Sequence, residues 1–553
     1  MKKHLFAALL LLSLLLMPLV PVTALEPSSD AESYSDPGTG LWELEYGEVY
    51  TKIKDALLRG ETQISLSSYR ITPEELSTIF QTLYYTEAEL FVMAPSYSYS
   101  MLMDGRHVSK LMPTYRYDVD EIEGVLADFH DRIDKILSEM PKGLSPLGRL
   151  IFLYDYLATH FVYEATDANY DAYGMLVEGN GVCQAYSLLL RYLLRAVGIP
   201  AECVTSSSLV HEWNIVKLGD AWYHVDVTWD DTDDRGMLGQ VDHNYFLLSD
   251  AAFMAGKHYA SDWVSPVSAD DLRYDGAFQS VSSRFVFDAD GQIYVVKDTY
   301  LCAFDETDGF MPLKRISATR PVGNGQIWSG LFSGLALLSG RLLYNTESEV
   351  RLYDPSTGED SLLLDFGDVT GVRNYLYGFL LDGASGTVTV SFKTGAGVGD
   401  VAYTVVTRRV AFTVVWMILG AEYEEIYFLG ETPLCKEETE VTDDRYRFTF
   451  LGWDRPIAAV TEDAVYTAEY SVSELFTESA AELLLCLATA SDEGESLYAR
   501  YTALTRALAI KDGVNPAYEG VQDAVAGLEA LISAYNADAE AFSSVFAAWV
   551  PLP

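Results

Sequence analysis

Positive charge is scarce in this 553-residue sequence. Lys and Arg together number 37 against 81 Asp and Glu, which gives a formal net charge of −44 at pH 7. Proteins that bind nucleic acid by neutralising phosphates need many basic side chains, and a strongly acidic surface is repelled by anionic lipid headgroups. The composition therefore argues against a nucleic-acid partner and against attachment to a membrane surface through charge.

Cysteine is also scarce, and gaps of 20, 99, 133 and 51 positions separate its five occurrences. Small secreted disulfide scaffolds are dense in cysteine, and zinc sites show paired Cys-x-x-Cys spacing. Neither pattern is present, so we expect no disulfide framework, no bound metal and no cofactor. Each cysteine is interpreted by itself, with a small buried hydrophobe as the default. The five are Cys183, Cys203, Cys302, Cys435 and Cys486.

The longest apolar stretch stands at the start of the sequence. Lys2 and Lys3 precede an apolar stretch over residues 5–20, and Val22-Thr23-Ala24 then offers the small residues that a signal peptidase recognises. This pattern predicts a secretory signal peptide over residues 1–24, followed by a polar linker over 25–45. The run is short for a membrane-spanning helix, which needs about 20 apolar residues, and an uncleaved anchor is the alternative.

The remaining composition is that of a folded protein. Hydrophobic residues make up 49% of the sequence and aromatic residues 13%, and a domain typically takes roughly 100 to 200 residues. The length therefore predicts three to five domains. Two helix starts are clear: Thr72-Pro73-Glu74-Glu75 predicts a helix to about Tyr84, and Ser145-Pro146 predicts one ending near His160.

Residues 181–250 carry the strongest local pattern. An apolar run beginning at Cys183 and closed by Gly198-Ile199-Pro200 predicts a buried helix, with Cys183 in or next to its first turn. A strand is predicted over 201–205. Two more, over 212–217 and 222–228, are joined by a tight turn at Gly219-Asp220.

Three further segments follow. Over 275–400, Gly291 precedes Asp305 by 14 positions, and Gly340 precedes Asp354 by the same distance 49 residues later. This repeat predicts propeller-type blade units, with a third near 377–390. Because a propeller ring typically needs four to eight blades, a plain β-sandwich is the alternative. Residues 474–553 are rich in Ala and Leu and predict a helical hairpin or bundle.

Residues 402–471 predict a separate small β unit. It contains Gly452-Trp453-Asp454 and Tyr466-Thr467-Ala468, which resemble the ends of the β-grasp repeat of bacterial surface proteins, the internalin B repeat. The resemblance covers about 70 residues.

Cys183, His211 and Asp226 supply the residue types of thiol catalysis. A hairpin turning at Gly219-Asp220 pairs positions whose numbers sum to about 439, which sets Asp226 opposite Trp213. His211 lies two residues away on the same face, so His211 and Asp226 are expected to be diagonal neighbours. Asp226 would then fix the tautomer of His211, and the other ring nitrogen would face a nucleophile.

A cysteine thiol can act as that nucleophile only where it can ionise. Free cysteine has a pKa near 8.5 and needs a cationic neighbour or a helix N-terminus to form thiolate at neutral pH. The predicted position of Cys183 offers both, since helix N-termini carry partial positive charge and His211 supplies an imidazolium. The Cys183 N–H is also a natural oxyanion donor.

The same residues resemble the bacterial secreted transglutaminase-like family. The resemblance lies in five blocks, YGML (173–176), GVCQAY (181–186), HEWN (211–214), WYHVDVTWD (222–230) and NYFL (244–247). It implies a papain-like catalytic core over 141–268, an α/β region over 46–140, and Cys183, His211 and Asp226 as nucleophile, base and orienting residue. Ala185 departs from the family, where many relatives have Gly. The predicted fold class is thus multidomain α+β, a papain-like transglutaminase core followed by all-β units and C-terminal helices.

The resemblance implies an exported enzyme, secreted or at the bacterial cell surface. It would attack a carboxamide or peptide carbonyl of an extracellular protein or peptide, such as one in the cell wall. Water as acceptor would make it a peptidase or amidase, and a lysine amine a protein-glutamine acyltransferase. A binding or scaffold protein with an inert papain-like domain is the alternative. Glycan hydrolysis by paired carboxylates is disfavoured because no pair stands out among 81 acids.

Several nearby residues have competing interpretations. His224 shares the hairpin face of Asp226 and is the rival base. Trp213 and Trp229 are expected to be packing residues rather than substrate platforms, and Cys203 a core residue. The acidic run 230–234 lacks the glycine and distal Glu of a calcium loop, so we expect a solvated turn.

Overall fold

The computed structural model describes most of the chain, and the predicted signal peptide and Cys435 lie outside the described residues. The chain forms two compact units, Met1–Arg408 and Arg409–Pro553. The described ranges are 40–164, 169–232, 237–256, 258–316, 319–321, 327–329, 333–370, 375–393, 404–434, 440–442, 446–514 and 521–543.

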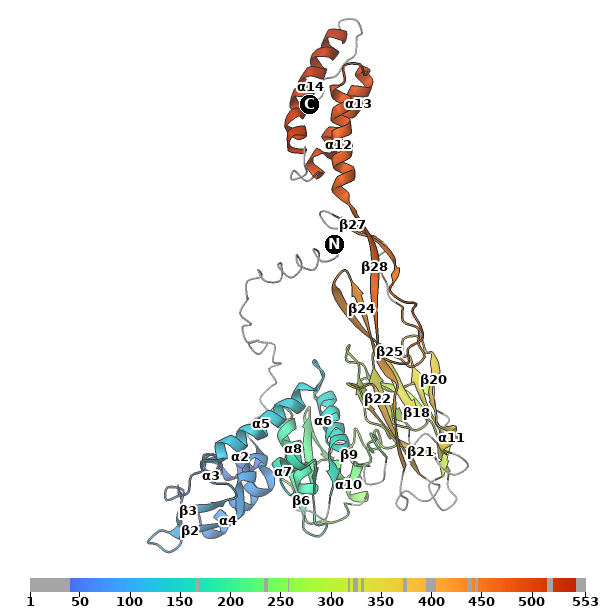
Figure 1. Ribbon diagram of the computed structural model, residues 1–553. Helices are drawn as coiled ribbons and strands as arrows, with labels where there is room; N and C mark the ends of the chain where they lie inside the picture. The colour runs from blue at the N-terminus through green and yellow to red at the C-terminus, as the bar shows by residue number, and fades with distance from the viewer. Residues whose placement is uncertain are drawn as a thin grey trace, which may run out of the picture. The chain divides into compact units, whose positions relative to one another are not determined.

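The first unit begins with a small α/β layer (Figure 1, blue). Its three strands pair in the order β1-β3-β2. The helix predicted at Thr72 is confirmed: the Thr72 hydroxyl accepts the Glu75 N–H, and the Glu75 carboxylate accepts the Thr72 N–H, which makes a capping box. The elements are α2 (Leu41–Tyr46), α3 (Glu48–Leu58), β1 (Ile64–Ser65), α4 (Pro73–Thr86), η1 (Ala88–Val92), β2 (Met93–Met101) and β3 (Val108–Tyr115). Helix α2 therefore begins within the predicted linker.

Helices and a five-stranded antiparallel sheet form the next part of this unit (Figure 1, cyan and green). The sheet has the order β10-β6-β7-β8-β9. Helix α8 packs against β6, β7, α6 and α7. The helices are α5 (Ile122–Ser138), α6 (Pro146–His160), α7 (Ala172–Glu178), α8 (Cys183–Ala196), α9 (Val227–Asp230) and α10 (Asp250–Ala255). The strands are β4 (Val162–Tyr163), β5 (Asn180–Gly181), β6 (Ala201–Ser206), β7 (His211–Leu218), β8 (Ala221–Val225), β9 (Phe246–Leu248) and β10 (Trp263–Val264).

The β7–β8 hairpin has the predicted register. Asn214 pairs with Val225, and Leu218 with Ala221. The predicted extent of the second strand is wrong, because β8 ends at Val225 and not at Thr228. Asp226 leaves the ladder there and caps α9, its side chain accepting the N–H of Trp229. An Asp that caps a helix satisfies an otherwise orphaned backbone donor, which explains why the strand stops.

A buried ion cluster joins α8 to the end of α4. The Arg191 side chain donates to the Glu202 carboxylate at 2.9 Å and to the Thr86 carbonyl at 2.7 Å, and it lies 3.5 Å from Glu87. Burial of such charges is tolerated only when each is paired. Since Tyr85 directly precedes Thr86, this cluster fixes the part of α4 that faces the site described below.

The rest of the first unit is β structure. Two four-stranded antiparallel meanders repeat the same order, β11-β12-β13-β14 and β17-β18-β19-β20, and a three-stranded sheet β21-β22-β23 follows. The strands are β11 (Val286–Phe287), β12 (Ile293–Lys297), β13 (Tyr300–Asp305), β14 (Gly309–Arg315), β15 (Thr319–Pro321), β16 (Ile327–Ser329), β17 (Leu335–Leu338), β18 (Arg341–Asn345), β19 (Glu349–Tyr353), β20 (Asp360–Asp365), β21 (Tyr375–Asp382), β22 (Thr387–Lys393) and β23 (Thr404–Arg409), with the short helix α11 (Gly367–Thr370).

The second unit joins a mixed sheet to a helical bundle (Figure 1, orange and red). The sheet order is β25-β24-β28-β27-β26, with β24 and β28 parallel. A separate apolar core holds three helices together. The elements are β24 (Ala411–Ile418), β25 (Ala421–Phe428), β26 (Glu440–Thr442), β27 (Tyr446–Trp453), β28 (Ala464–Glu474), α12 (Leu475–Ser491), α13 (Leu497–Ile510), η3 (Lys511–Gly513) and α14 (Val521–Ser543). Within the described ranges, no helix has the length and apolarity that crossing a bilayer requires.

Replacement of Arg191 tests the cluster that holds α4. Arg191→Met leaves the Glu202 and Glu87 carboxylates without their buried partner, and we expect it to lower the free energy of unfolding by about 3–5 kcal/mol. Urea unfolding followed by tryptophan fluorescence measures this. Arg195→Met is the matched control, because Arg195 is more exposed and lies 3.8 Å from Glu202. If the two substitutions lowered the free energy of unfolding equally, the role assigned to Arg191 in the ion cluster would be contradicted.

Candidate active site

Cys183 is the first residue of α8, and its side chain is partly exposed. The turn before it is tightly packed: a Cβ on Gly181 would come 2.9 Å from the Ala185 methyl and 3.2 Å from Met175 Sδ. Glycine at 181 therefore makes room for alanine at 185, the position that departs from the family pattern. This packing places the Cys183 sulfur at the positive end of a buried helix.

His211 and Asp226 meet as the hairpin register predicts. His211 Nε2 lies 2.7 Å from Asp226 Oδ2, and both side chains are buried. The other carboxylate oxygen accepts from the Thr228 hydroxyl at 2.6 Å and from the Trp229 N–H at 3.3 Å. With Nε2 engaged, Nδ1 is the ring nitrogen left for a second partner.

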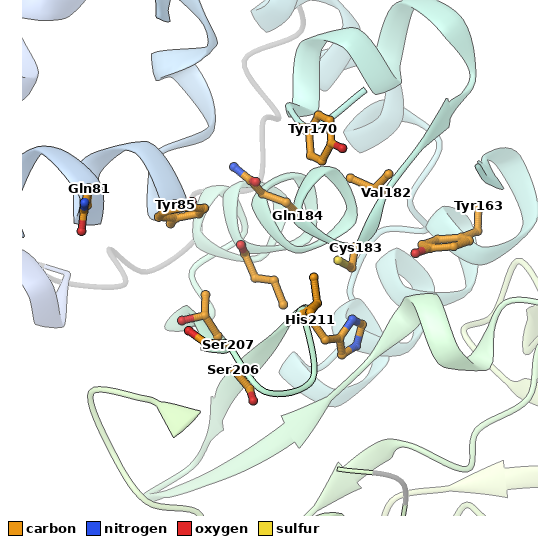
Figure 2. A pocket seen from close by; sticks show the side chains of 13 residues that line it. Gln81, Tyr85, Tyr163, Tyr170, Val182, Cys183, Gln184, Ser206, Ser207 and His211 are labelled. Atoms are coloured by element: carbon orange, nitrogen blue, oxygen red, sulfur yellow. The ribbon is translucent and has the colours of Figure 1, made fainter. Parts of the chain in front are cut away.

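Cys183 lines the same cleft as His211, and its sulfur lies near the His211 ring (Figure 2). Burial alone would lower the pKa of His211, but the Asp226 charge and hydrogen bond, followed by Cys183, raise it to about 10. Burial opposes ionisation of Asp226, yet the charge and hydrogen bond of His211 hold its pKa below the usual range. The structure thus favours an ionised Asp226 beside a protonated His211.

His258 also contacts Asp226 and was missed by the sequence interpretation. Its Nε2 lies 2.8 Å from Oδ2 of Asp226, and its side chain is fully buried. The residue follows α10 and lies outside the sequence blocks of the family resemblance. No local pattern marks it, because only the fold brings this loop to the hairpin.

A cleft of about 620 Å³ opens over Cys183 and His211. Figure 2 shows the Cys183 sulfur near the His211 ring, with tyrosines from separate segments around the opening. Val210 is 86% exposed at its rim and has φ of 51°, an unfavourable backbone conformation for a β-branched residue. The cleft is lined by Gln81, Tyr85, Tyr163, Tyr170, Val182, Cys183, Gln184, Thr205, Ser206, Ser207, Val210, His211 and Glu212.

Glu212 is a second residue that the sequence interpretation did not identify. It belongs to the cleft lining, is 4% exposed, and has one carboxyl oxygen without a hydrogen-bond partner. Burial, reinforced by the nearby Cys183, raises its pKa well above the usual value. In its protonated form, this carboxyl group would offer both a donor and an acceptor at the cleft wall.

The rival residues are engaged elsewhere. His224 accepts from Trp213 Nε1 at 3.0 Å, and its Nε2 lies 2.8 Å from Asp250. Cys203 is buried, as expected, and burial raises its pKa well above the usual value. Trp213 is buried, in line with the predicted packing role.

The expected solvated acidic turn is wrong for Asp230, which is fully buried. Its carboxylate accepts from the Tyr154 hydroxyl at 2.7 Å and from the N–H groups of Asn244 and Tyr245. It therefore organises the loop before β9. Asp233 and Asp234 lie outside the described residues.

One group of side chains in the described ranges has the spacing that a metal ion would need. His211, Asp226 and His258 offer two imidazole nitrogens and one carboxylate oxygen within 4.8 Å of one another, a donor set that suits zinc. Both nitrogens already hydrogen-bond to the same oxygen of Asp226. An ion bound there would break the contact that orients His211, so it would oppose thiol chemistry.

The stability of the protein should depend on pH through the pairing of His211 with Asp226. Because the pKa of His211 is raised to about 10, its contribution is complete below about pH 6.5 and is lost as the pH rises toward 10. Asp226 contributes above about pH 4 and loses its contribution in acid. We expect Asp226→Asn to flatten both dependences, measured as the thermal unfolding midpoint against pH. Parallel curves for the two proteins would contradict the pairing.

Comparison with known proteins identifies the region that carries this site. Residues 136–227 match the transglutaminase-like superfamily, and no curated protein is significantly similar to the chain in sequence. A structure of a candidate cysteine protease from Cytophaga hutchinsonii is 17% identical, over 24% of this chain and 61% of its own, with a TM-score of 0.17. A TGase structure is 17% identical, over 24% of this chain and 44% of its own, with a TM-score of 0.16.

This chain therefore spans about three fifths of the first protein's length and under half of the second's. The matched segment contains α8 and the β7–β8 hairpin, and with them Cys183, His211 and Asp226. Residues 136–227 thus form a domain that matches the transglutaminase-like superfamily.

Proposed function

We propose that the chain is an exported cysteine enzyme that forms a thioester on Cys183. The observation that carries the proposal is that Cys183, at the start of a buried helix, lies near His211 in an open cleft, and that His211 is paired with Asp226 at 2.7 Å. An imidazolium beside a thiol stabilises the thiolate. The helix N-terminus adds to that stabilisation.

The first half-reaction follows from this arrangement. The Cys183 thiolate attacks the carbonyl carbon of a carboxamide or peptide, and the carbonyl oxygen takes up the negative charge. First-turn N–H groups of α8, including that of Cys183, are placed to receive this oxyanion. When the intermediate collapses, the C–N bond breaks, His211 gives its proton to the departing amine, and the acyl group remains on sulfur.

The second half-reaction reverses the roles. Neutral His211 takes a proton from the attacking acceptor while the acceptor adds to the thioester carbonyl. Collapse then breaks the C–S bond and restores the thiolate and the imidazolium. Asp226 stays ionised throughout and holds the ring in place. Water as acceptor gives hydrolysis, whereas an amine gives acyl transfer.

Selective alkylation tests the nucleophile. With iodoacetamide near pH 6, we expect Cys183 to react fastest and His211→Ala to lower its rate by roughly 10²-fold, because the thiolate fraction falls without an imidazolium. Peptide mass spectrometry resolves each cysteine, and Cys203 and Cys302, both buried, are internal references. His107→Ala is the control, because His107 lies in a hairpin that contributes no residue to the cleft lining. Equal labelling of all cysteines would favour an inert scaffold.

A paired assay separates the two acceptors. The mature protein is incubated with a casein-type substrate and a fluorescent amine, and both amine incorporation and peptide release are measured. Incorporation without cleavage, lost in Cys183→Ala, identifies an acyltransferase, and cleavage without incorporation a peptidase. If neither amine incorporation nor peptide release is detected, the proposed activity on protein carbonyls is contradicted.

A further inference from the structure

We propose that His258 is a positioning residue of the active site, holding the Asp226 carboxylate in the orientation that His211 requires. This inference rests on the proposed thiol chemistry of Cys183. His211, Asp226 and His258 form a series of hydrogen-bonded side chains behind Cys183, and of these four residues only Cys183 and His211 border the cleft.

The geometry around Asp226 leaves its carboxylate no freedom to rotate. Oδ2 lies 2.7 Å from His211 Nε2 and 2.8 Å from His258 Nε2. Oδ1 accepts from the Thr228 hydroxyl and the Trp229 N–H. Each carboxylate oxygen therefore accepts two hydrogen bonds, and the two histidines donate to the same oxygen, Oδ2. His258 is thus the only side chain in the described ranges, apart from His211, that hydrogen-bonds to Oδ2.

The surroundings of His258 specify which nitrogen carries its proton. Its Nδ1 is buried without a hydrogen-bond partner, so the proton of the neutral ring belongs on Nε2, where Asp226 accepts it. The ring packs on Phe253 at 3.8 Å and on Trp229 at 3.9 Å between centroids. An aromatic enclosure of this kind disfavours a second imidazolium beside His211.

The titratable groups that face His258 come from several elements. They are Asp226, His211, Tyr245 and His224. Burial, with a smaller opposing effect from Asp226, lowers the pKa of His258. The lowered pKa favours the neutral form of His258, which donates to Asp226 through Nε2 without adding a second positive charge beside His211.

Loss of this donor has a specific consequence. Without His258, Oδ2 of Asp226 keeps one donor, its carboxylate gains freedom to turn, and its ionised form is less well stabilised. Protonation of Asp226 would then occur at higher pH and would release His211 from its orientation. The reactivity of Cys183 should fall first on the acid side, whereas a purely structural defect would lower it at every pH.

The test is the rate of Cys183 alkylation by iodoacetamide from pH 4 to 9, measured by peptide mass spectrometry on the full-length mature protein. His258→Phe keeps an aromatic ring but no donor. We expect it to lower the alkylation rate about tenfold at pH 5. The acid limb, meaning the fall of the rate toward low pH, should move upward by about one pH unit. His258→Gln, whose amide can donate to Asp226, should recover most of the rate.

His224→Phe is the matched control. His224 is an equally buried histidine that also stacks on Phe253, but it pairs with Asp250. Its replacement should lower thermal stability about as much as His258→Phe while leaving the acid limb in place. Circular dichroism establishes that each variant is folded.

The outcomes separate this inference from the proposed function. If wild-type Cys183 reacts no faster than the other cysteines at any pH, the proposed function fails. If wild-type Cys183 is selectively reactive but His258→Phe has an unchanged acid limb, or the same limb as His224→Phe, the positioning role is wrong. Should His258→Phe fail to fold, an acid limb in His258→Gln moved upward by about one pH unit or more would overturn the proposal, because the glutamine amide can still donate to Asp226.

Discussion

The ionised carboxylate of Asp226, buried and surrounded by donors, is the interaction on which the rest of the site depends. An isolated carboxylate would be unfavourable at such a depth, and it is stable here because two imidazoles, a hydroxyl and a backbone N–H all point at it. The same carboxylate keeps His211 protonated and turns its other nitrogen toward Cys183. Under the proposed function, stability and reactivity would therefore share one cause.

The fold supplies these donors from different places. His211 starts β7 and Asp226 follows β8, so the hairpin register brings them together. His258 arrives on the loop after α10, and Cys183 at the start of α8, which packs on the same sheet. Arg191 links α8 to the end of α4, whose Tyr85 borders the cleft.

The sequence predicted the part of this arrangement that local rules govern. Turn position and strand alternation were sufficient to pair His211 with Asp226, and the caps at Thr72 and Ser145 located two helices. These signals depend on residues close together in the chain. The helix predicted at Cys183 also begins where the structure has it.

Other features depend on contacts that no local pattern encodes. Asp230 looked solvated because acidic neighbours follow it, yet Tyr154, far away in sequence, donates to its carboxylate in the core. His258 carries no signal in its own segment, and the burial of Glu212 could be inferred only once α8 was placed against β7. The end of β8 was missed because capping by Asp226 stops a strand whose sequence pattern continues to Thr228.

The central claim is that His211, beside Cys183, is held as an imidazolium by the Asp226 carboxylate at neutral pH. NMR titration of the protein labelled with ¹³C and ¹⁵N at histidine follows both ring nitrogens of His211 directly, with Cys183→Ala used for assignment. The account predicts that both nitrogens stay protonated from pH 5 to beyond pH 8, and that Asp226→Asn abolishes this. A His211 that titrates near pH 6.5 and is neutral at pH 8 would contradict it.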